Sequence, residues 1–183
     1  MNKLAIATIS GFLSLSASTS FAGDPKASPD VVGRNLSIWG LGSIGHVGMW
    51  SGSNVVEVLN KATVIQSNSL SSFKASDKVY WGAKYGVGAS NGAKIISSGW
   101  DQRNYSPSYT TTAYWQQGGV AQKVCTQYGK NGSCVRWTTS LSTAVFRCDT
   151  FVDFSFWKGN GSRLVAGGSI LPFIVYNSMP KTR

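Results

Sequence analysis

The sequence has few charged residues and few long helical patterns. Charged residues make up 13% of the 183 residues, whereas glycine and the aromatic residues are plentiful. This composition favours a strand-rich globular domain with a hydrophobic core over a disordered chain. No internal repeat is found, so a repeat architecture is not expected.

Only one long apolar run occurs, and it lies near the N-terminus. Lys3 precedes the run at residues 4–15, and small residues follow up to a small-x-small sequence at 20–22. This order is typical of a secretory signal peptide, and the run is too short and too interrupted to remain as a membrane anchor. We predict cleavage after Ala22, one mature domain over residues 23–183 without a transmembrane segment, and a secreted or periplasmic location.

Acidic residues are scarce. The chain has 17 lysines and arginines against 7 aspartates and glutamates, which gives a formal net charge of +10. A positive surface on an exported protein predicts an anionic partner, such as a cell-wall polymer or lipid headgroups. Nucleic acid is not expected as a partner, because of the predicted export and because the basic residues form no dense stripe.

Cysteine is also rare, and the three cysteines have different surroundings. Cys125 and Cys134 flank a segment whose Gly129 and Asn131-Gly132 favour a turn, so the pair can face each other across a hairpin. In an oxidising compartment this pair is the natural disulfide, and Cys148 is left over as a reactive thiol or an intermolecular link. One histidine and a bonded cysteine pair do not suffice for a zinc site, and we expect no cofactor.

The unpaired cysteine lies where a Ser/Thr-rich run gives way to a short amphipathic segment. Phe151, Val152 and Ser155 follow Cys148 at helical spacings, which places Cys148 in the first turn of a helix. A helix N-terminus stabilises a thiolate and can later bind an oxyanion, and the thiolate is the nucleophilic form of cysteine. The alternative is a buried structural cysteine, because free cysteine is often buried.

The single histidine and the single glutamate lie on two short predicted strands. His46 belongs to the alternating run 46–50, and Glu57 belongs to the run 55–59 beyond a turn at 51–54. A two-residue turn places both side chains on one face as near-diagonal neighbours, whereas a three-residue turn places them on opposite faces. A carboxylate can orient an imidazole, which can activate a thiol. The alternative is an ordinary surface hairpin.

Other elements are predicted from shorter patterns. A glycine-rich loop is expected at 40–45 and a short helix near 69–73. Strands are expected at residues 31–39, 94–98, 111–115 and 170–176, the last interrupted by Pro172.

Two sequence blocks resemble a known family. Gly45-His46-Val47-Gly48-Met49-Trp50-Ser51-Gly52, followed by Val55-Val56-Glu57, resembles a segment of circularly permuted NlpC-like cysteine hydrolases. These are the YiiX-type bacterial proteins, distant relatives of lecithin:retinol acyltransferase. In that family the histidine precedes the cysteine, and the cysteine begins a helix in a pattern that Cys148-Asp149-Thr150-Phe151-Val152 matches.

The resemblance implies both a fold and a set of roles. The fold would be α+β and papain-like in circularly permuted form, with a small antiparallel sheet packed against the helix that carries the cysteine. Cys148 would be the nucleophile, His46 the general base, and Glu57 the residue that orients His46. Two departures accompany the resemblance: Arg147 and Asp149 both flank the cysteine, and the long Ser/Thr/Tyr-rich region with its disulfide hairpin does not map onto the family pattern.

These observations predict an exported cysteine peptidase or amidase-type hydrolase. Its substrate would be an amide bond in the cell envelope, with peptidoglycan preferred because of the predicted export and the positive charge. Aromatic residues in 105–115 would stack on sugar rings or belong to the core of the sheet. Two alternatives stay open: a lipid acyltransferase or lipase on the same fold, and a non-catalytic secreted module that binds cell-wall polymer.

Overall fold

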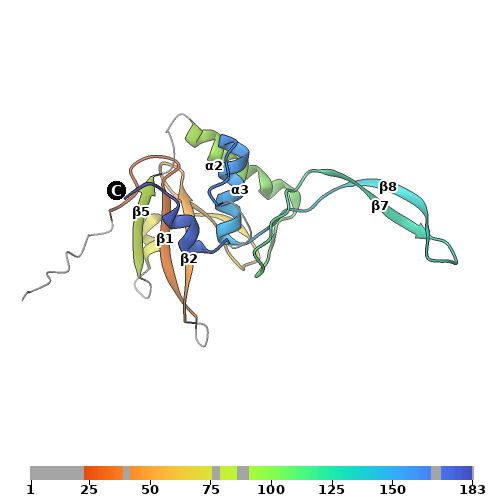
Figure 1. Cartoon of the computed structure of the whole chain (residues 1–183), viewed down its shortest axis with the longest axis horizontal. Coiled ribbons are helices and arrows are strands. Elements are labelled where there is room, and N and C mark those ends of the chain that lie inside the picture. Colours follow the sequence, from red (N-terminus) through yellow and green to blue (C-terminus); the bar gives the residue numbers. More distant parts are fainter. Residues whose placement is uncertain (1–22, 39–41, 76–78, 86–90, 166–169, 183) are drawn as a thin grey trace, which may run out of the picture.

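An antiparallel sheet of six strands forms the centre of the fold (Figure 1). The structure is a computed structural model, and it describes residues 23–38, 42–75, 79–85, 91–165 and 170–182. The predicted signal peptide, residues 1–22, lies outside the described residues. The strand order is β10-β5-β1-β2-β3-β4, and each neighbouring pair is antiparallel. The strands are β1 (Val31–Ile38), β2 (Gly42–Trp50), β3 (Val55–Val58), β4 (Ile65–Asn68), β5 (Tyr80–Tyr85) and β10 (Lys181–Thr182).

Helices pack on this sheet, so the predicted α+β class is confirmed. α3 and α4 both contact β2, and α2 packs along α3 (Figure 1). The helices are α1 (Leu70–Lys74), α2 (Gly92–Trp100), α3 (Cys148–Asn160), α4 (Pro172–Asn177) and the 3-10 helix η2 (Asp101–Tyr105). No helix in the described part of the chain has the length and apolar character needed to cross a bilayer.

Two apolar clusters lie on opposite faces of the sheet. The larger one joins Val31 and Val56 to residues of α2, α3 and α4. The smaller one joins Val32 and Val55 to Phe73 of α1. Because successive residues of a strand point to opposite faces, these adjacent valines bury both sides of the sheet.

Helix α3 begins at Cys148, as predicted, and it is buried from that residue to Phe156. It is therefore an interior helix over this stretch, not an amphipathic one. Buried polar groups need hydrogen-bond partners. Asp153 accepts bonds from the Arg163 Nε at 2.6 Å and from the Leu164 amide at 2.8 Å.

Three of the predicted strands are wrong: those at residues 94–98, 111–115 and 170–176. Residues 94–98 belong to helix α2, whose buried positions Gly92, Ile95 and Gly99 recur at helical spacing. Packing of that face on α3 outweighs the strand propensity of the isoleucines, because propensity is a weak determinant of structure. Residues 111–113 form bends, and residues 114 and 115 have no regular structure, so this segment contains no strand.

The C-terminal segment is also helical where a strand was expected. α4 begins at Pro172, in the first helical turn, where the missing N–H of proline costs no hydrogen bond. Two further predictions hold in part. The strand expected at 31–39 is observed as β1, and the helix expected near 69–73 is observed as α1. The glycine-rich loop expected at 40–45 is wrong from Gly42 onward, because β2 begins there.

A long hairpin projects from the body of the protein (Figure 1). It consists of β7 (Ala121–Tyr128) and β8 (Cys134–Leu141). The disulfide Cys125–Cys134 joins the two strands with a Cα–Cα distance of 5.7 Å, which confirms the predicted pairing. The chain enters and leaves the hairpin beside a short parallel pair, β6 (Ser108–Tyr109) and β9 (Val145–Phe146).

Candidate active site

The turn between β2 and β3 sets the register of His46 and Glu57. Trp50 pairs with Val55, and the Ser51 amide donates to the Asn54 carbonyl at 2.8 Å, which leaves a two-residue turn at the centre. Gly52 in this turn has a φ of +107°, a conformation that glycine adopts without strain. This is the turn length that brings His46 and Glu57 together.

The two side chains meet inside the protein. The Nε2 atom of His46 lies 2.6 Å from Oε2 of Glu57. The exposed fractions of His46 and Glu57 are 2% and 1%. A buried imidazole–carboxylate contact of this length is a strong hydrogen bond that fixes the ring orientation.

Glycines on either side of His46 make room for its neighbours. A Cβ atom added at Gly45 would lie 2.2 Å from the Trp81 ring, and one added at Gly48 would lie 2.6 Å from Cγ1 of Val55. The Gly48 position also lies 3.3 Å from the Cβ of Glu57. Glycine at this position therefore allows β3 to approach β2 closely enough for Glu57 to reach the imidazole.

Further residues hold the carboxylate of Glu57. Asn68 on β4 donates to Oε1 at 2.8 Å, and the guanidinium of Arg34 on β1 lies 3.4 Å from Oε2. Burial alone would raise the pKa of Glu57, but the bond to His46, the bond from Asn68 and the charge of Arg34 together lower that pKa. Glu57 is therefore an anion at neutral pH.

Arg34 is itself placed by its neighbours. It pairs directly with His46 across β1 and β2, and its guanidinium carbon lies 4.3 Å from the centroid of the Phe73 ring. One guanidinium nitrogen also donates to the Phe73 carbonyl. The same ring lies 5.7 Å from the ring of His46. Phe73 therefore supports both cationic side chains that face Glu57.

Cys148 approaches the imidazole from the start of α3. It is a free cysteine with an exposed fraction of 3%, and it lies close enough to His46 to contribute to the raised pKa of the imidazole. Because Nε2 of His46 is bound to Glu57, Nδ1 is the nitrogen left for the sulfur. Burial would lower the pKa of His46, but the charges and hydrogen bonds of Cys148 and Glu57 raise it to about 9.

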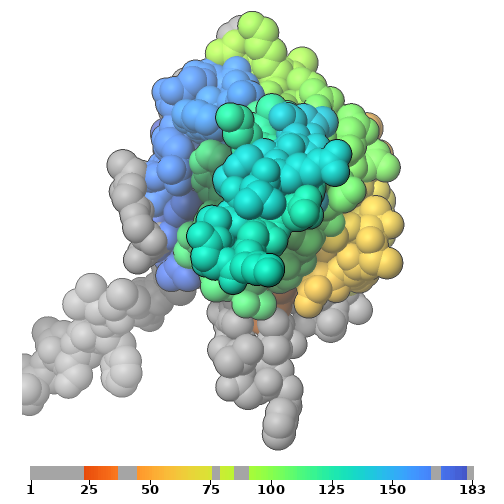
Figure 2. Space-filling view, turned by 90° about the vertical axis from the view of Figure 1, so that its right-hand side faces the viewer, coloured from red at the N-terminus to blue at the C-terminus, as the bar shows by residue number. Residues whose placement is uncertain are grey.

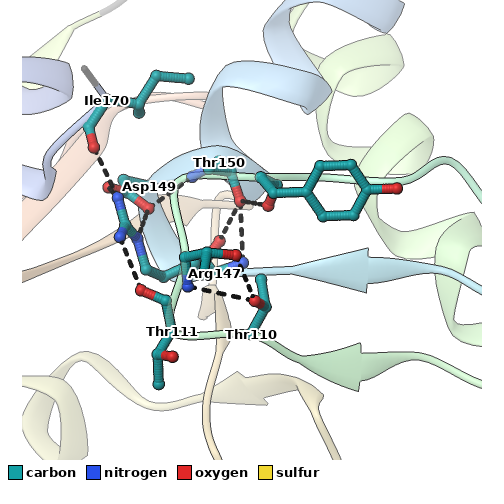
Figure 3. A network of polar contacts seen from close by, with 8 residues as sticks. Thr110, Thr111, Arg147, Asp149, Thr150 and Ile170 are labelled. Carbon is teal, nitrogen blue, oxygen red and sulfur yellow. Dashed lines mark hydrogen bonds and ion pairs between the residues drawn. The ribbon is translucent and has the colours of Figure 1, made fainter. Parts of the chain in front are cut away.

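An ion pair between Arg147 and Asp149 spans the turn that carries Cys148 (Figure 3). The Arg147 guanidinium donates to both carboxylate oxygens of Asp149, at 2.7 and 2.6 Å. It also donates to the carbonyl of Thr111 at 3.0 Å and to the carbonyl of Ile170 at 2.6 Å. Asp149 is fully buried. The pair therefore ties the start of α3 to two segments that are distant in the sequence.

A neighbouring hydroxyl strengthens this attachment. The Arg147 amide donates to Oγ1 of Thr150 at 2.9 Å, and the same hydroxyl lies 3.2 Å from the Tyr114 carbonyl. The Thr110 amide donates to the Phe146 carbonyl at 2.9 Å. Segment 108–114 therefore lies against the turn before Cys148.

Tyr109 lies on this segment, near the residues that precede Cys148. It pairs with Phe146, two residues before Cys148, in the parallel β6–β9 ladder. Burial raises the pKa of Tyr109 to about 12, and the charge of Cys148 contributes to the same shift. The phenol is therefore protonated at neutral pH and able to donate a hydrogen bond.

The structure thus brings together all three residues predicted from the sequence. Sequence reasoning missed the residues around them: Arg34, Asn68 and Tyr109. An arginine within the apolar strand Val31-Val32-Gly33-Arg34 is the one signal that pointed to a buried partner of opposite charge. Asn68 and Tyr109 lie on other segments, and nothing local in the sequence distinguishes them.

A surface hollow of about 650 Å³ lies elsewhere in the structure. It is lined by hydroxyl, amide and apolar side chains, which include Ser28, Ser97 and Trp100, and by none of the three residues above. Among the residues that the structure describes, no three His, Cys, Asp or Glu side chains gather as a metal site.

Comparisons with known proteins supply no relative for this site. The chain matches no family model, no curated protein and no solved structure. The site is therefore interpreted from its own geometry and from the two sequence motifs.

Proposed function

We propose that this protein is an exported cysteine hydrolase that cleaves an amide bond in the cell envelope. The observation that carries the proposal is a single buried imidazole held between a carboxylate and a thiol. The chain has one histidine, one glutamate and one cysteine outside the disulfide, and these three side chains meet. In this arrangement the thiol is the nucleophile, the imidazole is the base that activates it, and the carboxylate orients the imidazole.

The reaction begins with proton transfer from the Cys148 thiol to His46. The pKa of about 9 for His46 supports an imidazolium at neutral pH, and an imidazolium stabilises the adjacent thiolate. The position of Cys148 at the first residue of α3 adds the positive end of the helix dipole. Glu57 keeps the imidazole in the required orientation.

The thiolate then attacks the carbonyl carbon of the substrate amide. The C–N bond breaks, His46 donates its proton to the leaving amine, and a thioester remains on Cys148. Water, activated by the neutral His46, attacks the thioester and releases a carboxylic acid and the thiol. Removal of one member of such a unit lowers the rate by orders of magnitude.

An oxyanion forms on the substrate carbonyl during both attacks. The Cys148 backbone N–H at the start of α3 is one donor for it. We assign the Tyr109 hydroxyl as the second donor, because Tyr109 pairs with Phe146 of the strand that leads into Cys148 and its phenol is protonated at neutral pH. Both donors come from the segments that Arg147 ties together.

The proposal includes a papain-like arrangement in circularly permuted form. A small antiparallel sheet packs against the helix that begins at the cysteine, and the histidine strand precedes that helix in the chain. These features agree with the family that the two motifs resemble.

Peptidoglycan is the proposed substrate class. The predicted export places the protein in the cell envelope, and the net charge of +10 attracts a polymer that bears peptide carboxylates. A lipid ester is the second candidate, because apolar side chains stand exposed beside the site. Leu171 and Phe173 are 51% and 61% exposed, and they follow Ile170, whose carbonyl binds Arg147.

The test is an activity assay of the mature protein on purified peptidoglycan and on phospholipid. Mass spectrometry of the products should show new amine and carboxyl termini, and Cys148→Ala and His46→Ala should abolish them. Thr138→Ala, on the exposed hairpin, is a matched control that should keep full activity. Turnover that survives Cys148→Ala would contradict the proposed nucleophile, and turnover of lipid alone would contradict the substrate class.

A further inference from the structure

The projecting hairpin is the least buried part of the described chain. We call residues 120–142 the arm. All residues of β7 except Cys125 are exposed, and all residues of β8 except Cys134 and Ser140 are exposed. In Figure 2, which looks at the molecule from the side on which the arm projects, the arm stands in front of the body.

Large apolar side chains on the arm face solvent. Val135, Trp137 and Leu141 are 58%, 58% and 59% exposed. Trp137 and Leu141 occupy odd-numbered positions in the regular part of the β7–β8 pairing, so they lie on the same face of the two-stranded ribbon, and Val135 lies beside a shift in that pairing. Val124 and Tyr128 on β7 are also exposed. A row of exposed apolar residues on a ribbon too thin to have its own core indicates a surface that binds something.

The charges of the arm are all positive. Lys123, Lys130 and Arg136 lie within it, and the sequence from residue 102 to 148 contains no aspartate or glutamate. Lys123 pairs with Thr139, which places it on the same face as Trp137 and Leu141. A partner that fits this surface must combine negative charge with an apolar layer.

The base of the arm is anchored firmly to the body. The buried Gln102 side chain accepts a bond from the Gly118 amide at 2.8 Å, and the Tyr105 ring packs against Gly118 and Gly119. Ser142 bonds to the Gly119 amide at 3.0 Å through its carbonyl and to the Val120 amide at 3.0 Å through its hydroxyl. The disulfide fixes the far half of the ribbon. The arm is therefore a preorganised surface.

We propose that the arm docks the protein onto the surface of an anionic phospholipid bilayer. Trp137, Leu141 and Val135 enter the boundary between headgroups and acyl chains, where tryptophan and aliphatic side chains are favoured. Lys123, Lys130 and Arg136 bind the anionic headgroups. This inference goes beyond the proposed hydrolase function and does not depend on it.

The composition of the arm favours lipid over the other anionic partner expected in the envelope. A glycan polymer can stack on Trp137 or Tyr128, but it offers nothing apolar to cover Val135 and Leu141. A second copy of the arm is disfavoured because two surfaces with only positive charges repel each other.

The experiment is vesicle co-sedimentation of the mature protein. One set of vesicles consists of phosphatidylcholine, and the other contains phosphatidylglycerol as well. We expect binding to the anionic vesicles only, and weaker binding as salt is raised. Neutralising one arm cation, as in Arg136→Gln, should weaken the partition coefficient about fivefold. Lys94→Gln, an exposed cation on α2, is the control and should have little effect.

A double variant and a matched control test the contribution of the apolar side chains to vesicle binding. Trp137→Ser combined with Leu141→Ser should lower binding at least tenfold, because each loses an apolar side chain from the docking face. Val79→Ser removes a valine that directly precedes β5 and is 65% exposed, and it should leave vesicle binding unchanged. Trp137→Phe should keep vesicle binding but lose most of the fluorescence quenching by lipids that carry bromine on their acyl chains.

Three results would overturn the proposal. The first is equal binding to both kinds of vesicle, or binding that the arm variants do not change. The second is arm-dependent binding to purified peptidoglycan with none to vesicles. The third is self-association in sedimentation velocity that Trp137→Ser with Leu141→Ser abolishes, since the arm would then bind a second copy of the chain.

Discussion

Arg147 and Asp149 bind each other across the residue between them, Cys148. Their side chains form two hydrogen bonds of 2.7 and 2.6 Å, and the guanidinium continues to the carbonyls of Thr111 and Ile170. The sequence showed only that these two charged residues flank the cysteine, and the structure gives them a structural role. They fix the conformation of the turn from which the thiol and the first N–H groups of α3 project.

Arg147→Ala should destabilise the protein strongly. It leaves the fully buried Asp149 carboxylate without its cation, and such a loss costs on the order of 3–5 kcal/mol. Urea unfolding measures the difference. Lys94→Ala, at an exposed position of α2, is the control and should change the free energy of unfolding by no more than about 0.5 kcal/mol. An equal, small effect of both variants would show that the pair does not hold the turn.

The parts of the site that the sequence predicted depend on local spacing. The helix start at Cys148, the disulfide across a glycine-rich turn and the meeting of His46 with Glu57 each follow from a period or a turn length. The two-residue turn was one of two possibilities, and the hydrogen bond from Ser51 to Asn54 selects it.

The parts that were missed depend on contacts between distant segments. Arg34 and Asn68 reach Glu57 from β1 and β4, and Tyr109 pairs with Phe146 of β9, two residues before Cys148. Residues 94–98 and 170–176, which lie in or overlap α2 and α4, were predicted as strands, and each segment contains two adjacent β-branched apolar residues. Their burial on α3 and on the sheet decides their conformation, and no short window of sequence contains that information.

The pH dependence of catalysis should report the protonation of His46. The imidazolium protonates the leaving amine, and its pKa is raised, so the acid form persists until the pH approaches this value. We therefore expect kcat/KM to fall as the pH rises above about 9. Glu57→Gln removes a negative charge that raises the pKa of His46, so the fall should move to lower pH, with a smaller loss of activity than in His46→Ala. If kcat/KM of Glu57→Gln falls at the same pH as that of the parent protein, Glu57 does not act on the imidazole.

The thiol should react as a thiolate that is difficult to reach. Alkylation of Cys148 by iodoacetamide at neutral pH should be on the order of tenfold faster than in His46→Ala, since an unassisted thiol is only a few per cent ionised. A bulky maleimide dye should react far more slowly than iodoacetamide, because the exposed fraction of Cys148 is 3%. In denaturant the two proteins should react alike. If His46→Ala matches the parent protein in the folded state, the imidazole does not activate the thiol.

Tyr109 should contribute to the rate of acylation and not to the reactivity of the thiol. Tyr109 pairs with Phe146, two residues before Cys148, and its hydroxyl is protonated at neutral pH. The loss of one oxyanion donor lowers kcat about 10²–10³-fold. Tyr109→Phe keeps the ring and its packing, so we expect a loss of this size in kcat with little change in KM. Alkylation of Cys148 by iodoacetamide should stay at the parent rate. Tyr114→Phe removes a hydroxyl that bonds to Gln116 on the surface of the same segment, and it should keep full activity. An unchanged kcat in Tyr109→Phe would assign the second donor to another group.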